Sequence, residues 1–184
     1  MYKFLYDSFA ERWYRKGGTV YFYSDPHFAD EEMVLLRKNY IGDEEQIKSI
    51  NRICGKKDTL IILGDVGDIE YVKRLRAAYK VLVMGNHDKG ASNYRGVFDE
   101  VYEGMVFISP KLVLTHEPVN VPFAFNIHGH DHSGELAGPT HINLCAERIG
   151  YRPLSLKAIC TSGFLKNIPD IHRVAIDKAS HRTE

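Results

Sequence analysis

The sequence predicts an α/β fold, and three observations carry that prediction. Short apolar runs rich in β-branched and aromatic residues recur along the chain, as expected of buried strands. In the first half of the chain, segments with helical spacing separate these runs, which is the layering of α/β proteins. In the second half, the runs follow one another at short intervals. The predicted strands cover residues 19–23, 59–63, 81–84, 101–108, 111–114, 123–127 and 141–145.

Helices are predicted between the strands of the first half. One begins near Asp30, and a second begins at Asp43, where Gln46 is placed to complete a capping box. Asp68 is a favourable N-cap for a further helix over residues 69–78. The first half of the chain is therefore predicted to run strand, helix, strand, helix, strand.

Residues 1–18 form an extension ahead of the first predicted strand. Its apolar residues are spaced as one face of a helix, which Gly17-Gly18 would end. These residues are Phe4, Leu5, Phe9 and Trp13. We expect a helix that covers part of the core, and an arm that binds a partner is the alternative. At the other end, a last helix is predicted over residues 154–160, and the polar tail from Asp170 is expected to fray.

The composition predicts one domain of ordinary globular type. A chain of 184 residues without a repeat or linker suits a single domain over residues 1–184. The 24 basic and 24 acidic residues balance, which leaves no overall charge for binding nucleic acid or an anionic membrane. No apolar run approaches the roughly 18–20 residues of a membrane span. Three cysteines without a CxxC pair, and no signal-peptide pattern, predict reduced thiols in a cytoplasmic protein.

Polar clusters follow five of the strand-like runs. Six of the nine histidines lie in or beside these clusters, whereas histidines that only fill a core would be scattered. Loops that leave the ends of neighbouring strands can meet at one rim of a sheet, so we expect the clusters to form a single site. The clusters are Asp25-x-His27, Gly64-Asp65, Gly85-Asn86-His87-Asp88, Thr115-His116 and Gly129-His130-Asp131-His132.

The chemistry of these clusters predicts metal binding. They offer carboxylate oxygen, amide oxygen and imidazole nitrogen without a thiolate, a donor set that suits Mn²⁺, Fe or Zn²⁺ and argues against a sulfur-rich structural zinc site. The ligands are too many for one ion and about enough for two. Two ions roughly 3.5–4 Å apart can share a carboxylate and a hydroxide, the arrangement used for in-line attack at phosphorus.

The five clusters, in this order, resemble the motifs of the calcineurin-like metallophosphoesterase family. The resemblance spans Asp25 to His132, a little over half of the chain, and the segment Asn143–Leu156 is similar to the part that closes small bacterial members. It implies a four-layer α-β-β-α sandwich with two mixed sheets. The 18 residues ahead of the first strand depart from the family pattern, which says nothing about them.

The resemblance also implies a role for each motif residue. His87 would donate a hydrogen bond or a proton to the leaving oxygen, with Asp88 orienting its ring. Asp65 would bridge two ions, because a carboxylate has two oxygens. One ion would be held by Asp25, His27, Asp65 and His132. The other would be held by Asp65, Asn86, His116 and His130.

The function expected from the sequence is hydrolysis of a small phosphoester by a metal-bridging hydroxide. A histidine placed to protonate a poor alkoxide leaving group favours phosphodiesters over monoesters, and a nucleotide or nucleic-acid fragment is a candidate substrate. Mn²⁺ is the first choice of metal, with Fe, Zn²⁺ and Ni²⁺ open. Two other classes remain: a metal-binding scaffold of the same fold, and a phosphatase acting on phosphoserine or phosphothreonine. The sequence leaves the oligomeric state open.

Overall fold

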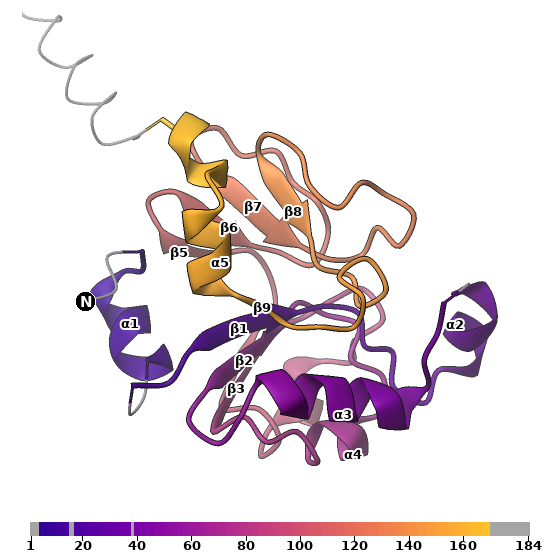
Figure 1. Ribbon diagram of the computed structural model, residues 1–184. Helices are drawn as coiled ribbons and strands as arrows, with labels where there is room; N and C mark the ends of the chain where they lie inside the picture. The colour runs from indigo at the N-terminus through magenta and orange to yellow at the C-terminus, as the bar shows by residue number, and fades with distance from the viewer. Residues whose placement is uncertain (1–3, 15–16, 38, 170–184) are drawn as a thin grey trace, which may run out of the picture.

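The computed structural model describes residues 4–14, 17–37 and 39–169. It contains two mixed β-sheets that pack face to face (Figure 1), so the predicted α/β fold with two mixed sheets is confirmed. The first sheet has the strand order β4-β3-β2-β1-β9, and its strands are Glu100–Tyr102, Tyr79–Val83, Thr59–Ile62, Val20–Tyr23 and Leu154–Ser155. The second has the order β5-β6-β7-β8, and its strands are Val106–Ser109, Leu112–Leu114, Phe125–His128 and His141–Asn143.

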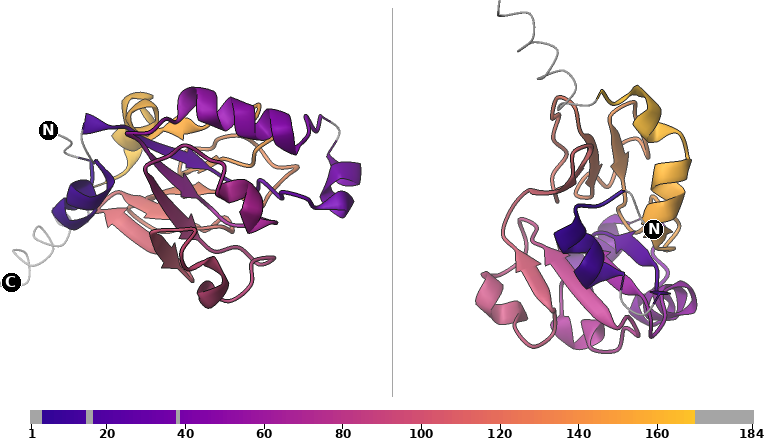
Figure 2. Two further views of the ribbon diagram at one scale, coloured as in Figure 1. Left: turned by 90° about the horizontal axis from the view of Figure 1, so that it is seen from below. Right: turned by 90° about the vertical axis from the view of Figure 1, so that its left-hand side faces the viewer.

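The helices are short and lie around these sheets. The α-helices are α1 (Asp7–Trp13), α2 (Glu31–Leu36), α3 (Asp43–Ile53), α4 (Ile69–Val72) and α5 (Leu156–Thr161). The described residues also include the 3₁₀ turns η2 (Ala91–Tyr94) and η3 (Phe164–Asn167). Helices α3 and α4 cover the outer face of the five-stranded sheet (Figure 2). Helix α5 lies next to β1 and β9 and packs Leu156 and Ile159 into the core between the two sheets. Helix α2 projects at the right-hand end of Figure 1, away from both sheets.

Each sheet contains a set of parallel strands, and the loops that form the site leave the ends of these strands. Strands β1, β2, β3 and β4 are parallel neighbours, and only β9 pairs with this sheet in the antiparallel sense. In the second sheet, β6, β7 and β8 are parallel and β5 is antiparallel. The carboxyl ends of parallel neighbours lie at the same edge of a sheet, so the loops that leave them emerge together.

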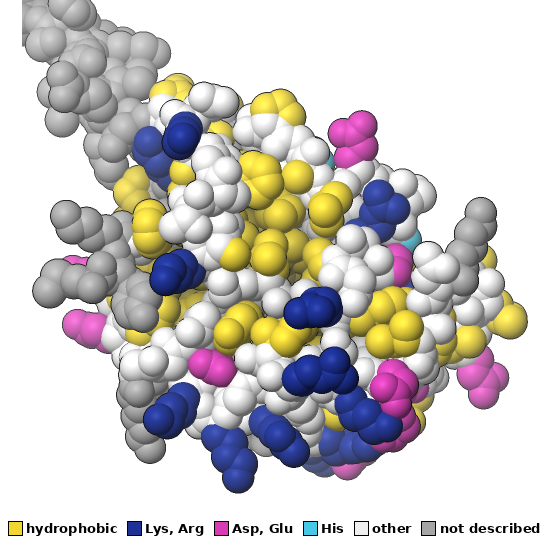
Figure 3. Space-filling view, viewed as in Figure 1, with side chains coloured by type: hydrophobic (Ala, Val, Ile, Leu, Met, Phe, Trp, Pro, Cys, Tyr) yellow, Lys and Arg dark blue, Asp and Glu magenta, His cyan; other side chains and the backbone are white. Residues whose placement is uncertain are grey.

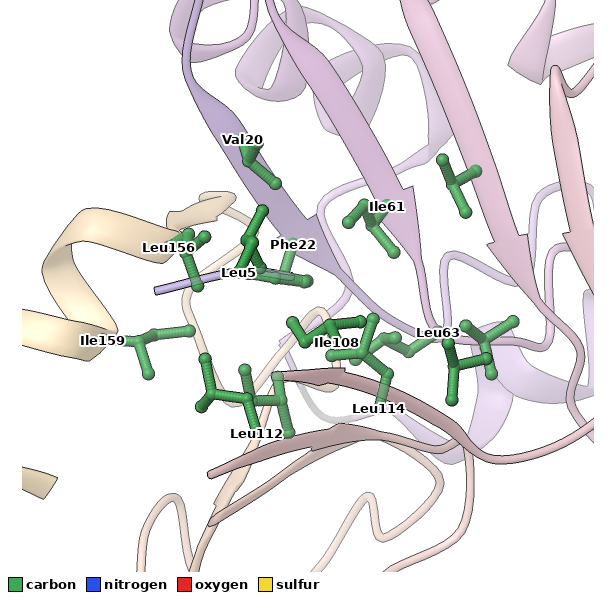
Figure 4. Close-up of a cluster of buried hydrophobic side chains, with 14 of the residues drawn as sticks. Leu5, Val20, Phe22, Ile61, Leu63, Ile108, Leu112, Leu114, Leu156 and Ile159 are labelled. Carbon is green, nitrogen blue, oxygen red and sulfur yellow. The ribbon is translucent and has the colours of Figure 1, made fainter. Parts of the chain in front are cut away.

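The main core lies between the two sheets. Strand β2 is buried on both faces, as expected of a central parallel strand. Ile61 and Leu63 face the second sheet, where Leu112 and Leu114 meet them (Figure 4). On the other face, Leu60 and Ile62 pack against residues of α3 and α4. Burial of these side chains fixes the position of one sheet against the other.

Four sequence predictions need correction. The strand predicted over residues 101–108 is two strands, β4 and β5, because the chain passes from one sheet to the other between Tyr102 and Val106. Helix α4 ends at Val72 because the chain must reach β3 at Tyr79, although Asp68 caps it as predicted. The helix predicted over residues 154–160 begins at Leu156, because the two residues before it pair with β1 as β9.

The capping box predicted for α3 is also wrong. The N-cap is Gly42, and Gln46 points inward. Its amide oxygen accepts a hydrogen bond from the Tyr23 hydroxyl at 2.6 Å, and its amide nitrogen donates to the Pro26 carbonyl oxygen at 3.1 Å. A buried amide with two hydrogen-bond partners stabilises the fold more than an exposed helix cap does. The tertiary contacts therefore determine where the Gln46 side chain points.

Helix α1 is an integral part of the core. The predicted helix is present over Asp7–Trp13, and the side chain of Trp13 is fully buried. Its indole nitrogen lies 3.3 Å from Glu100 Oε1, and its carbonyl oxygen accepts a hydrogen bond of 2.6 Å from the Thr59 hydroxyl. The interpretation of this segment as a helix that covers the core is therefore confirmed. The predicted fraying from Asp170 lies outside the described residues.

The surface shows the mixed charge that the composition indicates. On the face drawn in Figure 3, Lys and Arg side chains gather near α3 with Asp and Glu side chains among them. Some of these charges are paired, such as Arg74 with Glu44 and Lys48 with Glu45. Among the described residues, no helix has both the length and the apolar character to cross a bilayer.

Removing the Trp13 side chain tests whether α1 belongs to the core. We expect Trp13→Ala to lower the free energy of unfolding by about 3–5 kcal/mol, because a fully buried indole leaves a cavity. Tyr6→Ala is the control, since this side chain is 41% exposed and its loss should cost no more than about 0.5 kcal/mol. Urea unfolding of both variants gives the comparison. Equal, small losses would show that α1 is a surface arm.

Candidate metal centre

The structure brings seven of the predicted site residues to one rim. The loops that carry them leave the carboxyl ends of five strands, β1, β2, β3, β6 and β7. The two sheets contribute together, because the backbone nitrogen of His130 donates to Asp25 Oδ2 at 2.9 Å. The seven residues are Asp25, His27, Asp65, Asn86, His116, His130 and His132.

The backbone at this rim is strained. Four of the seven residues have positive φ angles, namely Asp25 at 53°, His27 at 44°, Asp65 at 51° and His130 at 67°. Side chains with a Cβ rarely adopt this region, and each such residue costs of order 1–3 kcal/mol. Strain of this kind persists only where surrounding contacts hold it and is concentrated at functional sites.

Two glycines of the motifs are required by close approach. A Cβ atom on Gly85 would lie 2.3 Å from Asp65 Oδ1, and a Cβ atom on Gly129 would lie 2.1 Å from Asp25 Oδ2. Neither contact is possible, since non-bonded atoms do not approach so closely. The glycines therefore let each loop pass directly against a carboxylate.

The first group of side chains, which we call the His27 half-site, consists of Asp25, His27, Asp65 and His132. His27 Nε2 lies 3.5 Å from Asp65 Oδ2 and 4.0 Å from Asp25 Oδ1, and His132 Nε2 lies 3.6 Å from Asp25 Oδ1. Asp25 Oδ1 and His27 Nε2 are buried and have no hydrogen-bond partner among the described residues. Buried polar atoms without partners are costly, so a bound group is expected there.

The second group, which we call the His116 half-site, consists of Asp65, Asn86, His116 and His130. His116 Nε2 lies 3.3 Å from Asp65 Oδ2 and 2.9 Å from Asn86 Oδ1. The same amide oxygen lies 3.0 Å from His130 Nδ1. Asp65 belongs to both groups, and its Oδ2 lies between the rings of His27 and His116.

The donor atoms of both half-sites fit divalent cations. Each group offers carboxylate oxygen and imidazole nitrogen from several directions, and the His116 half-site adds an amide oxygen, as Mn²⁺, Fe or Zn²⁺ sites require. His116 Nδ1 donates to the Leu63 carbonyl oxygen at 2.8 Å, which leaves its Nε2 directed at Asp65. A cation would neutralise the buried carboxylates that face one another here. That these seven residues bind ions remains a prediction.

Three further donors hold Asp25 in place. Its Oδ2 accepts from the Ser24 hydroxyl, from the His130 backbone and from the Cys145 thiol, whose sulfur is 3.3 Å away. This leaves Oδ1 as the atom that faces His27 and His132. Burial raises the pKa of the Cys145 thiol far above its usual range, so it acts as a neutral donor. The sequence places Cys145 only among three cysteines expected to be reduced.

The charges of Asp65 and His116 are coupled. Burial alone would lower the pKa of His116, but the hydrogen bond to Asp65 and the charges of Asp25 and Asp65 raise it to about 9. Burial would raise the pKa of Asp65, but His116 outweighs it and lowers that pKa to about 2. In the absence of metal, a proton on His116 would supply the positive charge beside Asp65. A metal ion would displace that proton.

His87 and Asp88 have different surroundings from the seven. His87 is exposed at the rim, its ring centroid 5.7 Å from that of His27, and its backbone nitrogen donates to Asp65 Oδ1 at 2.9 Å. Asp88 does not orient the His87 ring as predicted. Its carboxylate accepts hydrogen bonds from four other donors. Three of these are backbone nitrogens of the loops around the centre, which would otherwise lack a partner among the described residues. The donors are the backbone nitrogens of Asp65, Val66 and Gly85 and the Tyr94 hydroxyl.

Sequence reasoning missed the side chains that orient the imidazole rings. Asp30 Oδ2 lies 2.9 Å from His27 Nδ1, and Glu147 Oε1 contacts His132 Nδ1. Arg37 is buried behind both, with its Nε 3.7 Å from Glu147 Oε2. The sequence does give an indication for Asp30, because it lies only three residues after His27. The sequence gives no such indication for Arg37 and Glu147, because they lie far along the chain from the residues that they contact.

Comparison with known proteins identifies the family. The family model of the calcineurin-like phosphoesterases matches residues 18–138, which is more than half of the chain. The chain therefore belongs to the calcineurin-like phosphoesterase family, and the resemblance seen in the motifs is confirmed. Its membership indicates a hydrolase that acts on phosphoesters and a site for divalent metals.

One solved structure supports the fold, and two others are similar to the chain at lower scores. A protein of unknown function from Aquifex aeolicus is 26% identical, with a TM-score of 0.66 over 78% of this chain and 98% of its own. The nuclease MPE of Pseudomonas putida is 22% identical, with a TM-score of 0.44 over 60% of each chain. The phosphoesterase YfcE of E. coli is 20% identical, with a TM-score of 0.41 over 69% of this chain and 78% of its own. No curated protein matches the chain significantly.

The pKa of His116 leads to a pH dependence in the metal-free protein. Its folded pKa of about 9 lies above the ordinary value of 6.5, so its stabilising charge is fully present below pH 6.5 and is lost as the pH rises through 9. We expect the melting temperature of chelator-treated protein to fall over this range. In His116→Gln, the melting temperature should fall less over the same pH range, because the titrating imidazole is absent. Identical slopes for the two proteins would contradict the assignment of the proton to His116.

Proposed function

We propose that this chain is a dinuclear metal-dependent phosphoesterase that hydrolyses small phosphoesters, with phosphodiesters preferred over monoesters. The observation that carries the proposal is the position of Asp65, whose Oδ2 lies 3.5 Å from His27 Nε2 and 3.3 Å from His116 Nε2. A carboxylate with an imidazole on each side can serve two cations at once. Two divalent cations held there would polarise the phosphoryl oxygens and activate an attacking water.

The chain's own residues supply the remaining chemistry. The buried carboxylates of Asp25 and Asp65 would hold the cations, and the Asn86 amide oxygen would complete the second set of donors. His87 is exposed beside this centre, where a protonated ring can donate to the leaving oxygen of the ester. An alkoxide is a poor leaving group that gains most from such a proton, which motivates the preference for diesters.

A cavity of about 780 Å³ adjoins the centre on the His87 side. It lies between the beginnings of α2 and α4 and the turn η2, and it is wide enough for the alcohol part of a small ester. The aromatic rings in its wall are not available for stacking on a base. Phe28 is buried against Tyr71, and Tyr94 is buried against Phe98.

The charges of this cavity bear on the choice of substrate. One ammonium group, that of Lys89, faces a wall with four carboxylates, those of Asp30, Glu31, Glu32 and Asp68. Further phosphate groups would be repelled by this wall. We therefore favour a small ester whose alcohol part is uncharged or cationic, and we rank a nucleotide or nucleic-acid fragment second.

The other parts of the proposal come from the sequence. Mn²⁺ is the proposed metal, with Fe, Zn²⁺ or Ni²⁺ as substitutes that the same donors accept. A non-catalytic scaffold would not need a complete set of ligand side chains, and all seven are present here. A protein phosphatase would need a surface for a polypeptide, which makes it the weaker alternative. A cytoplasmic location remains a prediction.

Restoring metal to stripped protein tests the proposal. We expect chelator-treated protein to regain hydrolysis of bis(p-nitrophenyl) phosphate when Mn²⁺ is added, at a rate above that for p-nitrophenyl phosphate. Asp65→Ala should lose this activity by at least about 10²-fold, since one side chain serves both ions. Release of p-nitrophenol gives the rates, and a thymidine oligonucleotide tests the rejection of polyanions. No activity with any metal, despite two bound ions, would contradict the enzymatic proposal.

Replacing His87 tests its role as proton donor. We expect His87→Ala to slow cleavage of a dialkyl phosphodiester by about 10²–10⁴-fold, because the alkoxide must be protonated as it leaves. Cleavage of the p-nitrophenyl ester should change much less, because that phenolate leaves without a proton. Measured metal content serves as the control and should equal that of the unaltered protein. Equal losses on both esters would rule out the proton-donor role.

A further inference from the structure

Helix α2 has little packing of its own. It contains six residues, and none of them is buried. Leu35 and Leu36 are 87% and 73% exposed. The helix projects away from both sheets (Figure 1). A helix of this length is not stable in isolation, so the contacts at its two ends must hold it.

The residue before α2 contacts the His27 half-site. Asp30 is the N-cap, and its Oδ1 accepts a hydrogen bond of 3.1 Å from the Met33 backbone nitrogen. Its other oxygen, Oδ2, lies 2.9 Å from His27 Nδ1. One carboxylate thus starts the helix and sets the ring of His27, with Nε2 left to face Asp65.

The residue after α2 contacts the same half-site from behind. Arg37 is the C-cap, and its guanidinium is buried. It donates to the carbonyl oxygens of Asp25 at 2.7 Å and Pro26 at 3.4 Å, within the strained Asp25–His27 turn. Its Nε faces Glu147 Oε2 at 3.7 Å, and the other oxygen of Glu147 contacts His132 Nδ1.

The two ends of α2, together with Glu147, therefore hold three of the four residues of the His27 half-site. Asp30 sets His27, Arg37 fixes the turn of Asp25, and Glu147 sets His132. Among the described residues, no hydrogen bond or ion pair joins Asp30, Arg37 or Glu147 to Asn86, His116 or His130. We propose that α2 is a clamp for one ion, in which Asp30, Arg37 and Glu147 are positioning residues for the His27 half-site alone. The proposal rests on the metal centre of the proposed function.

Thermodynamic linkage makes the clamp act in both directions. If folded α2 strengthens binding of one ion, then binding of that ion must stabilise folded α2 by the same free energy. The backbone nitrogens of Val34 and Arg37 donate within this helix, to Asp30 and Met33. Their exchange with deuterium reports whether the helix is folded.

Metal content tests the clamp without measuring activity. We expect Mn²⁺ titration of the unaltered protein to give two ions per chain. Arg37→Met should weaken binding of one ion by about 10–100-fold and leave the other unchanged. Arg74→Met is the matched control, because Arg74 forms an exposed pair with Glu44 and makes no hydrogen bond or ion pair with a described residue of the centre. Asp30→Ser keeps a good N-cap but removes the carboxylate from His27, so it should weaken the same ion.

A double variant identifies which ion is lost. Asn86→Ala removes a ligand of the His116 half-site only, so Arg37→Met combined with it should weaken both ions. Glu147→Gln keeps an acceptor for His132 and should bind better than Glu147→Ala, a rescue that a general folding defect would not give. Hydrogen–deuterium exchange of residues 31–37 should slow by at least about tenfold when the His27 half-site binds its ion, and exchange in the control segment α3 should not change.

Several results would overturn the clamp. One is that Arg37→Met weakens the binding of both ions equally. Another is that the double variant Asp30→Ser/Arg37→Met binds both ions as the unaltered protein does. A third is that hydrogen–deuterium exchange in α2 is the same with and without metal. Unaltered protein that binds fewer than two ions would overturn the clamp and the dinuclear site together. Protein that binds two ions and shows the coupling, yet hydrolyses no ester, would disprove the proposed function and leave the clamp standing.

Discussion

The buried carboxylates of Asp25 and Asp65 impose the constraint on which the rest of this structure depends. Two anions that lie side by side in a protein interior need compensating charge or donors. One oxygen of each carboxylate accepts a hydrogen bond from a backbone nitrogen, and the other oxygen faces imidazole rings. In Asp25 the first of these oxygens also accepts from the Ser24 hydroxyl and the Cys145 thiol. The strained turns and the close-approaching glycines follow from that arrangement, because they bring the loops within reach.

The packing of the two sheets is also part of the site. Asp25, His27, Asp65 and Asn86 come from the five-stranded sheet, whereas the other three histidines come from the four-stranded sheet. The apolar core between the sheets therefore fixes the distances between donor atoms, and interiors packed at native density shift little. Stability and metal geometry are linked in this protein, since a loosened core would move one group of ligands against the other.

Family membership and local structure answer different questions. The family assigns hydrolysis of phosphoesters, but it does not choose the alcohol part of the substrate, which depends on the loops around the centre. In this chain those loops supply an acidic cavity without an open aromatic platform. They also supply α2, whose ends belong to one half of the centre. The two half-sites thus have unequal support from the side chains around them, and the proposed clamp acts on one of them.

The sequence by itself determined the residues that meet at the rim, because each follows an apolar strand whose end the pattern locates. It also determined the α/β class and the N-terminal helix. Only the tertiary structure decided the division of residues 101–108 between two sheets, the inward turn of Gln46 and the role of Asp88 as an anchor for backbone donors. It alone revealed Arg37 and Glu147, which are 110 residues apart (147 − 37) and adjacent in space. Local patterns record what a residue does for its own segment, whereas these contacts depend on how distant segments pack.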